Sequence, residues 1–208
     1  MKGLLLKDWY MMKAYARSYL LIVAVFTAIS LFSEQNLFFA FYPCILCGML
    51  PVTLLSYDER CRWNTYSGTL PYTKAQIVSS KYIMGLIVQT AVITATGTVH
   101  AVRMVVCQTF LWQDLITFIL LLSALSTLSC SFCMPFVFKF GVEKGRIAYY
   151  VMIGIACACS VISTALFKEE LSVEIRPHLL LAALAVLSGG LYALSWYLSI
   201  CFYKKREL

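Results

Sequence analysis

Cysteine is the residue type in this sequence whose spacing most resembles a chemical site, because Cys-x-x-Cys occurs twice, as in many zinc sites. The pairs are Cys44 with Cys47 and Cys130 with Cys133. Each pair lies inside a long apolar stretch, and at about 1.5 Å of rise per residue their depths in those stretches differ by roughly 12 Å. One ion could not bind both pairs. Cysteine is also a small, easily buried side chain, so we expect packing rather than a metal site or a disulfide framework.

Other residues that carry chemistry are badly placed for catalysis. Glu169 and Glu170 are paired as in some intramembrane proteases, but Glu174 and Arg176 follow them, which favours a solvated acidic loop at the outer mouth. No G-x-x-x-x-G-K-[ST] phosphate-binding loop occurs in the sequence. We therefore predict no catalytic residue, no metal ligand and no cofactor held by this chain.

The amino-acid composition indicates whether water or lipid surrounds the parts of the chain that carry these residues. Of the 208 residues, 61% are apolar and 13% are charged, and the mean hydropathy is +0.80. Soluble domains are nearer 45–50% apolar and about 25% charged. A chain this short cannot bury such an excess in one core, and disordered chains need low hydrophobicity. The composition therefore excludes a soluble globular protein and a disordered chain, and it indicates a membrane protein.

Long uncharged runs predict the spanning elements. A helix needs about 20 apolar residues to cross about 30 Å of hydrocarbon, and all runs but the first reach that length unaided. Residues 14–16 extend the first run. The sequence therefore predicts an all-α membrane protein with six transmembrane helices in a single domain over residues 1–208. The runs cover residues 18–33, 35–57, 82–102, 115–138, 147–167 and 177–203.

Positive charge in the connections predicts the orientation. Of the 17 lysines and arginines, 14 fall on the side that holds both termini, and the positive-inside rule places that side in the cytoplasm. The net charge of +7 is thus a topology signal and not a footprint for nucleic acid. Residues 1–17 mix apolar, aromatic and basic side chains, which predicts a helix lying in the cytoplasmic interface. A simple extension of the first span is the alternative.

The only long cytoplasmic connection, residues 58–81, is the best candidate for a partner site. Its first part, residues 58–67, predicts one short helix with Trp63 and Tyr66 on the same face. A Thr-x-x-Gln capping box at residues 73–76 predicts the start of the next helix. A short aromatic helix held below the membrane by two spans suits docking into a partner's groove. The alternative is an interfacial helix whose rings lie among lipid headgroups.

Three stretches of the chain resemble one family of membrane proteins. They are Asp58-Glu59 … Trp63 … Leu70-Pro71 … Ile77-Val78 … Lys81-Tyr82, the opening Met1-Lys2-Gly3-Leu4-Leu5-Leu6-Lys7-Asp8, and Pro135 … Lys139-Phe140-Gly141-Val142-Glu143-Lys144-Gly145-Arg146. Together they resemble ABC (ATP-binding-cassette) type-2 exporter permeases, in particular the compact six-span branch that includes phenol-soluble-modulin exporters. Gly68-Thr69 before Leu70 departs from the usual pattern of the family.

The resemblance implies a permease of the bacterial cell membrane that is not itself an enzyme and that binds a separate ABC ATPase subunit. That partner would bind ATP and Mg. Residues 58–67 would form a coupling helix, through which closure of the ATPase pair rocks the spans between inward and outward access. The residues implied in docking are Asp58, Glu59, Arg60, Arg62, Trp63 and Tyr66, with a second contact at Lys139, Glu143, Lys144 and Arg146.

A second copy of the permease is also implied, as a homodimer or a related heterodimer. Small residues four apart, Gly154 with Ala158 and Ala156 with Ser160, give a candidate dimer face in the fifth span. Spans rich in Phe, Tyr, Met and Ser suit amphipathic or hydrophobic cargo, either peptides or lipids, and the resemblance favours peptides. A non-transport membrane adaptor and an intramembrane enzyme are the alternatives.

Overall fold

The structure, a computed structural model, describes residues 2–15, 17–32, 38–67, 69–108, 111–147, 150–151, 154 and 177–205. Within these ranges the chain is helical, as predicted, and contains no strand. A further helical segment covers residues 142–147. The other helices are α1 (Lys2–Tyr15), α2 (Arg17–Phe32), α3 (Phe38–Gly48), α4 (Leu50–Arg60), α5 (Trp63–Ser67), α6 (Lys74–Val106), α7 (Trp112–Phe140) and α9 (Pro177–Lys205).

Four of these helical stretches are long and apolar enough to cross a membrane. They are Phe41–Arg60, Lys74–Val106, Trp112–Phe140 and Ala183–Lys205, and they match the second, third, fourth and sixth predicted spans. The first predicted span corresponds to α2, whose apolar part, Leu21–Ser30, is shorter. Most of the fifth predicted span lies outside the described residues. A count of six spans therefore stays a prediction.

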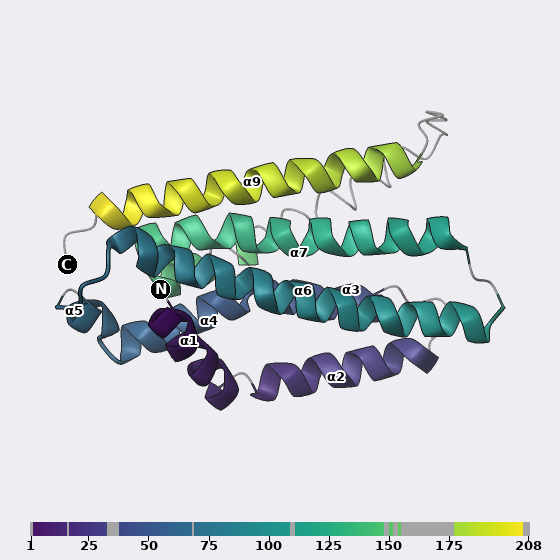
Figure 1. Cartoon of the computed structure of the whole chain (residues 1–208), viewed down its shortest axis with the longest axis horizontal. Coiled ribbons are helices and arrows are strands. Elements are labelled where there is room, and N and C mark those ends of the chain that lie inside the picture. Colours follow the sequence, from purple (N-terminus) through teal and green to yellow (C-terminus); the bar gives the residue numbers. More distant parts are fainter. Residues whose placement is uncertain are drawn as a thin grey trace.

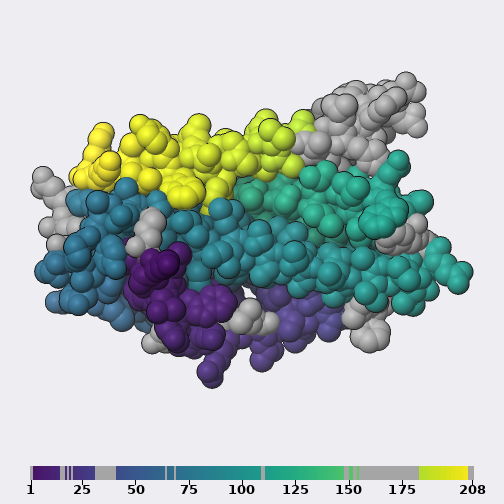
Figure 2. Space-filling view, viewed as in Figure 1, coloured from purple at the N-terminus to yellow at the C-terminus, as the bar shows by residue number. Residues whose placement is uncertain are grey.

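The long helices lie side by side along the longest axis of the molecule. Figure 1 shows α6, α7 and α9 in near-parallel alignment, with α2 on the opposite side from α9. α7 packs along α9, and α6 contacts both of them. In Figure 2, α9 forms a ridge along one edge of the molecule. At about 1.5 Å per residue, the 33 residues of α6 extend over roughly 50 Å. That length exceeds the hydrocarbon core of about 30 Å, so part of α6 projects beyond it.

α1 is a separate helix whose axis turns away from that of α2 (Figure 1). Leu4, Asp8 and Met12 recur every four residues on its buried face. Trp9 and Tyr10 are exposed on the other side. The turn between the two helices disfavours α1 as a straight extension of the first span. Its mixed exposed face is the kind that lies in a membrane interface.

Two hydrophobic clusters hold the helices together, and each contains one of the cysteine pairs. The first cluster includes Cys130 and Cys133, and the second includes Cys44 and Cys47. All four thiols are free and buried, so their side chains serve the packing role predicted for them.

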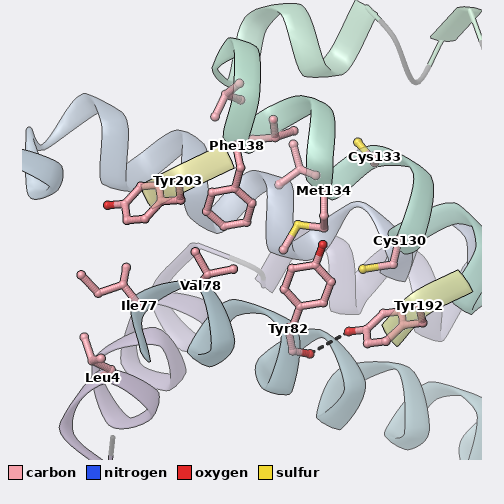
Figure 3. Close-up of a cluster of buried hydrophobic side chains, with 13 residues drawn as sticks. Leu4, Ile77, Val78, Tyr82, Cys130, Cys133, Met134, Phe138, Tyr192 and Tyr203 are labelled. Carbon is pink, nitrogen blue, oxygen red and sulfur yellow. Dashed lines mark hydrogen bonds between the residues drawn. The ribbon is translucent and has the colours of Figure 1, made fainter. Parts of the chain in front are cut away.

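Tyr82 lies at the centre of the first cluster (Figure 3). Its ring stacks on Trp196 at 5.5 Å and meets Tyr192 edge-on at 5.3 Å. Its hydroxyl lies 2.8 Å from the Ser195 hydroxyl and 2.7 Å from that of Ser199. The backbone carbonyl of Tyr82 accepts a hydrogen bond from the Tyr192 hydroxyl at 2.9 Å. These contacts join α6 to α9 and satisfy the buried polar atoms of the aromatic side chains.

The predicted helix over residues 58–67 is in fact two helices, and that prediction was wrong. α4 ends at Arg60, and Arg62 adopts a positive φ of 50°, a left-handed conformation that ends a helix. α5 then begins at Trp63. The capping box at the start of α6 is confirmed. The Thr73 side chain accepts from the Gln76 N–H, and the Gln76 side chain accepts from the Thr73 N–H.

Candidate functional site

A buried cluster of four charged side chains joins α1, α4 and α6; we call Lys7, Asp8, Asp58 and Lys81 the ion-pair cluster. Lys81 Nζ lies 2.5 Å from Asp8 Oδ1 and 2.6 Å from Asp58 Oδ2. Lys7 Nζ lies 2.6 Å from Asp58 Oδ1 and 3.7 Å from Asp8 Oδ1. Ser80 donates a longer hydrogen bond of 3.4 Å to Asp8. Two cations and two anions thus neutralise each other inside the protein.

Three members of the ion-pair cluster are shielded from solvent, with 1–3% of their side chains exposed, whereas Lys7 is 23% exposed. Burial lowers the pKa of Lys7 below its usual range, and the Lys81 ammonium acts in the same direction. The hydrogen bond and the charge of Asp58 oppose that shift. A buried ion in such a group is tolerated only while its partners are present. The cluster therefore fixes the positions of its three helices relative to one another.

Asp58 was predicted to be a docking residue, and the structure corrects this. Asp58 is 2% exposed, and its carboxylate is held by Lys7 and Lys81. Sequence reasoning placed Asp58 and Lys81 at the ends of a solvated loop. A local signal did exist. Asp58 follows Leu54 by four residues and Lys81 follows Ile77 by four, so each charge shares a helix face with a core residue. Both charges are therefore carried on faces that point into the core.

Trp63, the first residue of α5, connects this helix to the ion-pair cluster. The Lys7 ammonium lies 3.7 Å from the centroid of the Trp63 ring, within the range of a cation–π interaction. The ring packs against the first hydrophobic cluster. Its Nε1 is buried, and no hydrogen-bond acceptor reaches it in the described part of the chain. Trp63 therefore holds α5 against the bundle, whereas Tyr66, 58% exposed, faces outward.

Glu59 brings the two predicted contact regions together. Its Oε2 accepts a hydrogen bond of 3.3 Å from the N–H of Val142, in the first turn of the 142–147 helix. A carboxylate is favourable at this position because helix N-termini carry partial positive charge. The neighbouring Gly141 ends α7 with a φ of 89°. This left-handed turn sends the chain back alongside α4, so regions far apart in sequence share one surface.

The surface around Glu59 is hollowed by two polar cavities. One, of about 450 Å³, lies between the end of α4 and the 142–147 helix. The other, of about 440 Å³, lies between α5 and the same helix. Glu59 and Glu143 line both cavities. We call this region the Glu59 surface and define it by Glu59, Arg60, Arg62, Tyr66, Glu143, Lys144 and Arg146.

The other predicted residues lie elsewhere. Lys139 lines a groove between α7 and α9 and neither of the two polar cavities. In the candidate dimer face, Gly154 is helical and exposed, with open space where a Cβ would lie. Ala156, Ala158 and Ser160 lie outside the described residues, as do Glu169, Glu170 and Glu174.

The family is established by a comparison that covers almost the whole chain. No curated protein and no solved structure matches it. The model of a family described as ABC-2 family transporter protein matches residues 3–204. That range includes the ion-pair cluster, the Glu59 surface and, except for Lys205, the four long apolar stretches of the described residues. This membrane chain therefore belongs to the ABC-2 transporter family.

Proposed function

We propose that this chain is the permease of an ATP-driven exporter and that a separate ABC ATPase subunit docks on the Glu59 surface. Membership of the ABC-2 transporter family supports a membrane component of a transporter, a class that is generally not catalytic itself. The proposal therefore assigns ATP and Mg to the partner. The bond between Glu59 and Val142 is the observation that carries the docking site. It joins the end of α4, which α5 follows, to the 142–147 helix, so that one charged surface carries the exposed aromatic side chain of Tyr66.

The proposed coupling mechanism follows from how α5 is attached. A force on α5 would be transmitted through Trp63 to Lys7, and from Lys7 to the rest of the ion-pair cluster. The cluster joins α4 and α6, which each belong to a long apolar helical stretch. Closure of two ATPase subunits would thereby move two spans together instead of deforming a loop. In this proposal, the α4–α5 pair takes the role that the family resemblance implies for a single coupling helix.

The orientation that we propose places the Glu59 surface in the cytoplasm of a bacterial cell. In Figure 1, α1, α5 and the last turn of α9 lie at the same end of the molecule. Most of the positive charge belongs to that end, as the positive-inside rule requires for a cytoplasmic face. The permease would work as a homodimer or a related heterodimer.

For the cargo, we propose amphipathic or hydrophobic molecules, with peptides favoured by the resemblance to modulin exporters. Between Lys81 and Arg103, α6 carries no charged side chain, and a small polar cargo would need such groups within the membrane. A non-transport adaptor would bind the ATPase equally well. ATP-dependent uptake of a labelled amphipathic peptide into inside-out vesicles distinguishes the two functions, because an adaptor gives none.

Co-purification with an ABC ATPase encoded beside the permease gene tests the docking site. We expect Arg62→Glu and Tyr66→Ala each to lower ATPase binding at least tenfold, roughly the effect of losing one interface hot spot. Tyr10→Ala is the matched control, because Tyr10 is 62% exposed on α1 and lies outside the Glu59 surface. Equal retention by the native chain and both variants would disprove the docking site. Failure of the native chain to retain the ATPase would disprove the partner itself.

A further inference from the structure

A groove between α7 and α9 has the dimensions and chemistry of a lipid site. Its volume is about 530 Å³, and its lining is apolar except for two serines and one lysine. On α7 it extends from Leu128 to Phe140, roughly 18 Å at about 1.5 Å per residue. One leaflet contributes about half of the 30 Å hydrocarbon core. The groove therefore matches the depth of a single leaflet.

The polar atoms inside the groove are already engaged within the protein. The Ser131 hydroxyl donates to the Leu191 carbonyl at 2.9 Å. The Ser195 hydroxyl donates to the Ser131 carbonyl at 2.6 Å. These bonds join α7 to α9 beneath the groove, so its interior offers hydrocarbon contact and little polar recognition. Leu194 and Phe132 remain 55% and 44% exposed along its walls.

Lys139 supplies positive charge at one end of the groove. Its ammonium lies 5.0 Å from the ring centroid of Phe140 and 5.1 Å from that of Phe202, one on each helix. In the described part of the chain, no carboxylate lies within ion-pair distance of this exposed lysine. Lys204 and Lys205 end α9 at the same end of the bundle. A negative group at this position would meet positive charge, as in the basic pockets between spans that bind anionic headgroups.

From this geometry we infer that the α7/α9 groove binds one anionic phospholipid of the membrane, with an acyl chain along the groove and the phosphate at Lys139. The occupant is a resident lipid rather than exported cargo. The charge at one end and the single-leaflet length both select a lipid over a second protein copy, for which a neutral apolar groove would suffice. The inference requires membrane insertion but neither the docking site nor the cargo that we propose above.

Lipid retention by the purified permease tests the inference. Phosphatidylglycerol and phosphatidylcholine with identical acyl chains are offered in neutral detergent, and bound lipid is counted by native mass spectrometry. We expect the native chain to prefer phosphatidylglycerol at least fivefold, and Lys139→Glu to abolish that preference. Lys144→Glu is the matched control, because it makes the same charge change outside the groove. Equal preference in native and Lys139→Glu protein would overturn the inference.

A second pair of variants tests the groove itself. Leu194→Trp, which fills the groove, should lower retention of both lipids at least fivefold. Leu187→Trp, one heptad earlier on the exposed face of α9, should leave retention unchanged. If Leu194→Trp instead converts a dimer to a monomer with lipid retention intact, the groove is an interface between copies and the inference is wrong. Because ATPase co-purification is scored separately, failure here is distinguishable from failure of the docking proposal.

Discussion

Removing one charge from the ion-pair cluster leaves its partner buried without compensation. We therefore expect Asp58→Asn to lower the free energy of unfolding by about 3–5 kcal/mol, the usual cost of breaking a buried ion pair. Thermal unfolding in detergent measures this. Glu143→Gln is the control, since Glu143 is exposed and surface changes usually stay within about 0.5 kcal/mol. If both variants unfold at the native temperature, the cluster does not hold α1, α4 and α6 together.

At the same scale, two substitutions of Trp63 distinguish the contribution of its ring packing from that of its buried N–H group. Trp63→Ala removes the ring from beneath Lys7 and from the first hydrophobic cluster, so we expect a loss of about 2 kcal/mol or more. Trp63→Phe keeps an aromatic face and removes a buried N–H that has no acceptor in the described part of the chain. A buried donor without an acceptor costs about 1–3 kcal/mol. Removing it offsets much of the stabilisation that is lost with the smaller ring. The two variants should therefore differ clearly in unfolding temperature, and equal losses would contradict this account of Trp63.

Which of these residues the sequence could predict depends on whether the signal is local. The capping box of Thr73 and Gln76 follows from side chains three residues apart, and it formed as predicted. The partners of Asp58 lie on α1 and α6, far away in sequence. The spacing from Leu54 indicates a core face for Asp58, but no period or spacing identifies the distant lysines that neutralise it, and a charge without a known partner is expected in solvent. The four core cysteines were predictable for the opposite reason, since burial of a small apolar side chain requires no specific partner.

At the scale of elements, the Glu59 surface depends on the helical segment over residues 142–147 lying against α7. A Cβ on Gly145 would lie 2.3 Å from Val137 Cγ2 and 3.1 Å from its Cα. Backbone cannot yield as a flexible side chain can, so Gly145→Ala must displace the helix. We expect reduced ATPase co-purification together with a lowered unfolding temperature. Gly189→Ala is the matched control, because its Cβ would meet nothing within 4 Å and alanine favours a helix by about 1 kcal/mol.

At the same scale, the sequence carries no usual signal for the break between α4 and α5, and the break was therefore not predicted. Helix ends are usually signalled by glycine or asparagine in the left-handed conformation, but arginine occupies it here, at residue 62. Three tertiary contacts hold the break in place. Asp58 is fixed in the ion-pair cluster, Glu59 bonds Val142, and Trp63 lies beneath Lys7. Periodicity alone could therefore predict helical residues on both sides of Arg62 but not the turn between them.

For the whole molecule, the two exposed cysteines among the seven described report the orientation of the bundle. Cys61 follows α4 at the end that holds the Glu59 surface, and Cys107 follows the opposite end of α6. Cys44, Cys47, Cys130 and Cys133 are buried and should resist a membrane-impermeant maleimide. We expect intact cells to label Cys107 but not Cys61, and permeabilised cells to label both. Mass spectrometry of the labelled peptides assigns each site, with Cys61→Ser and Cys107→Ser as controls.

This labelling pattern bears on both proposals, because the docking site requires one orientation and the orientation determines which leaflet the lipid groove faces. ATP is available in the cytoplasm, so an ATPase can dock only if Cys61 and the Glu59 surface face that side. Lys139 lies at that end too, which assigns the lipid groove to the inner leaflet. Labelling of Cys61 in intact cells would therefore remove the docking surface from its nucleotide source and move the lipid site to the outer leaflet. The ion-pair cluster would keep its structural role in either orientation, since its partners lie within the protein.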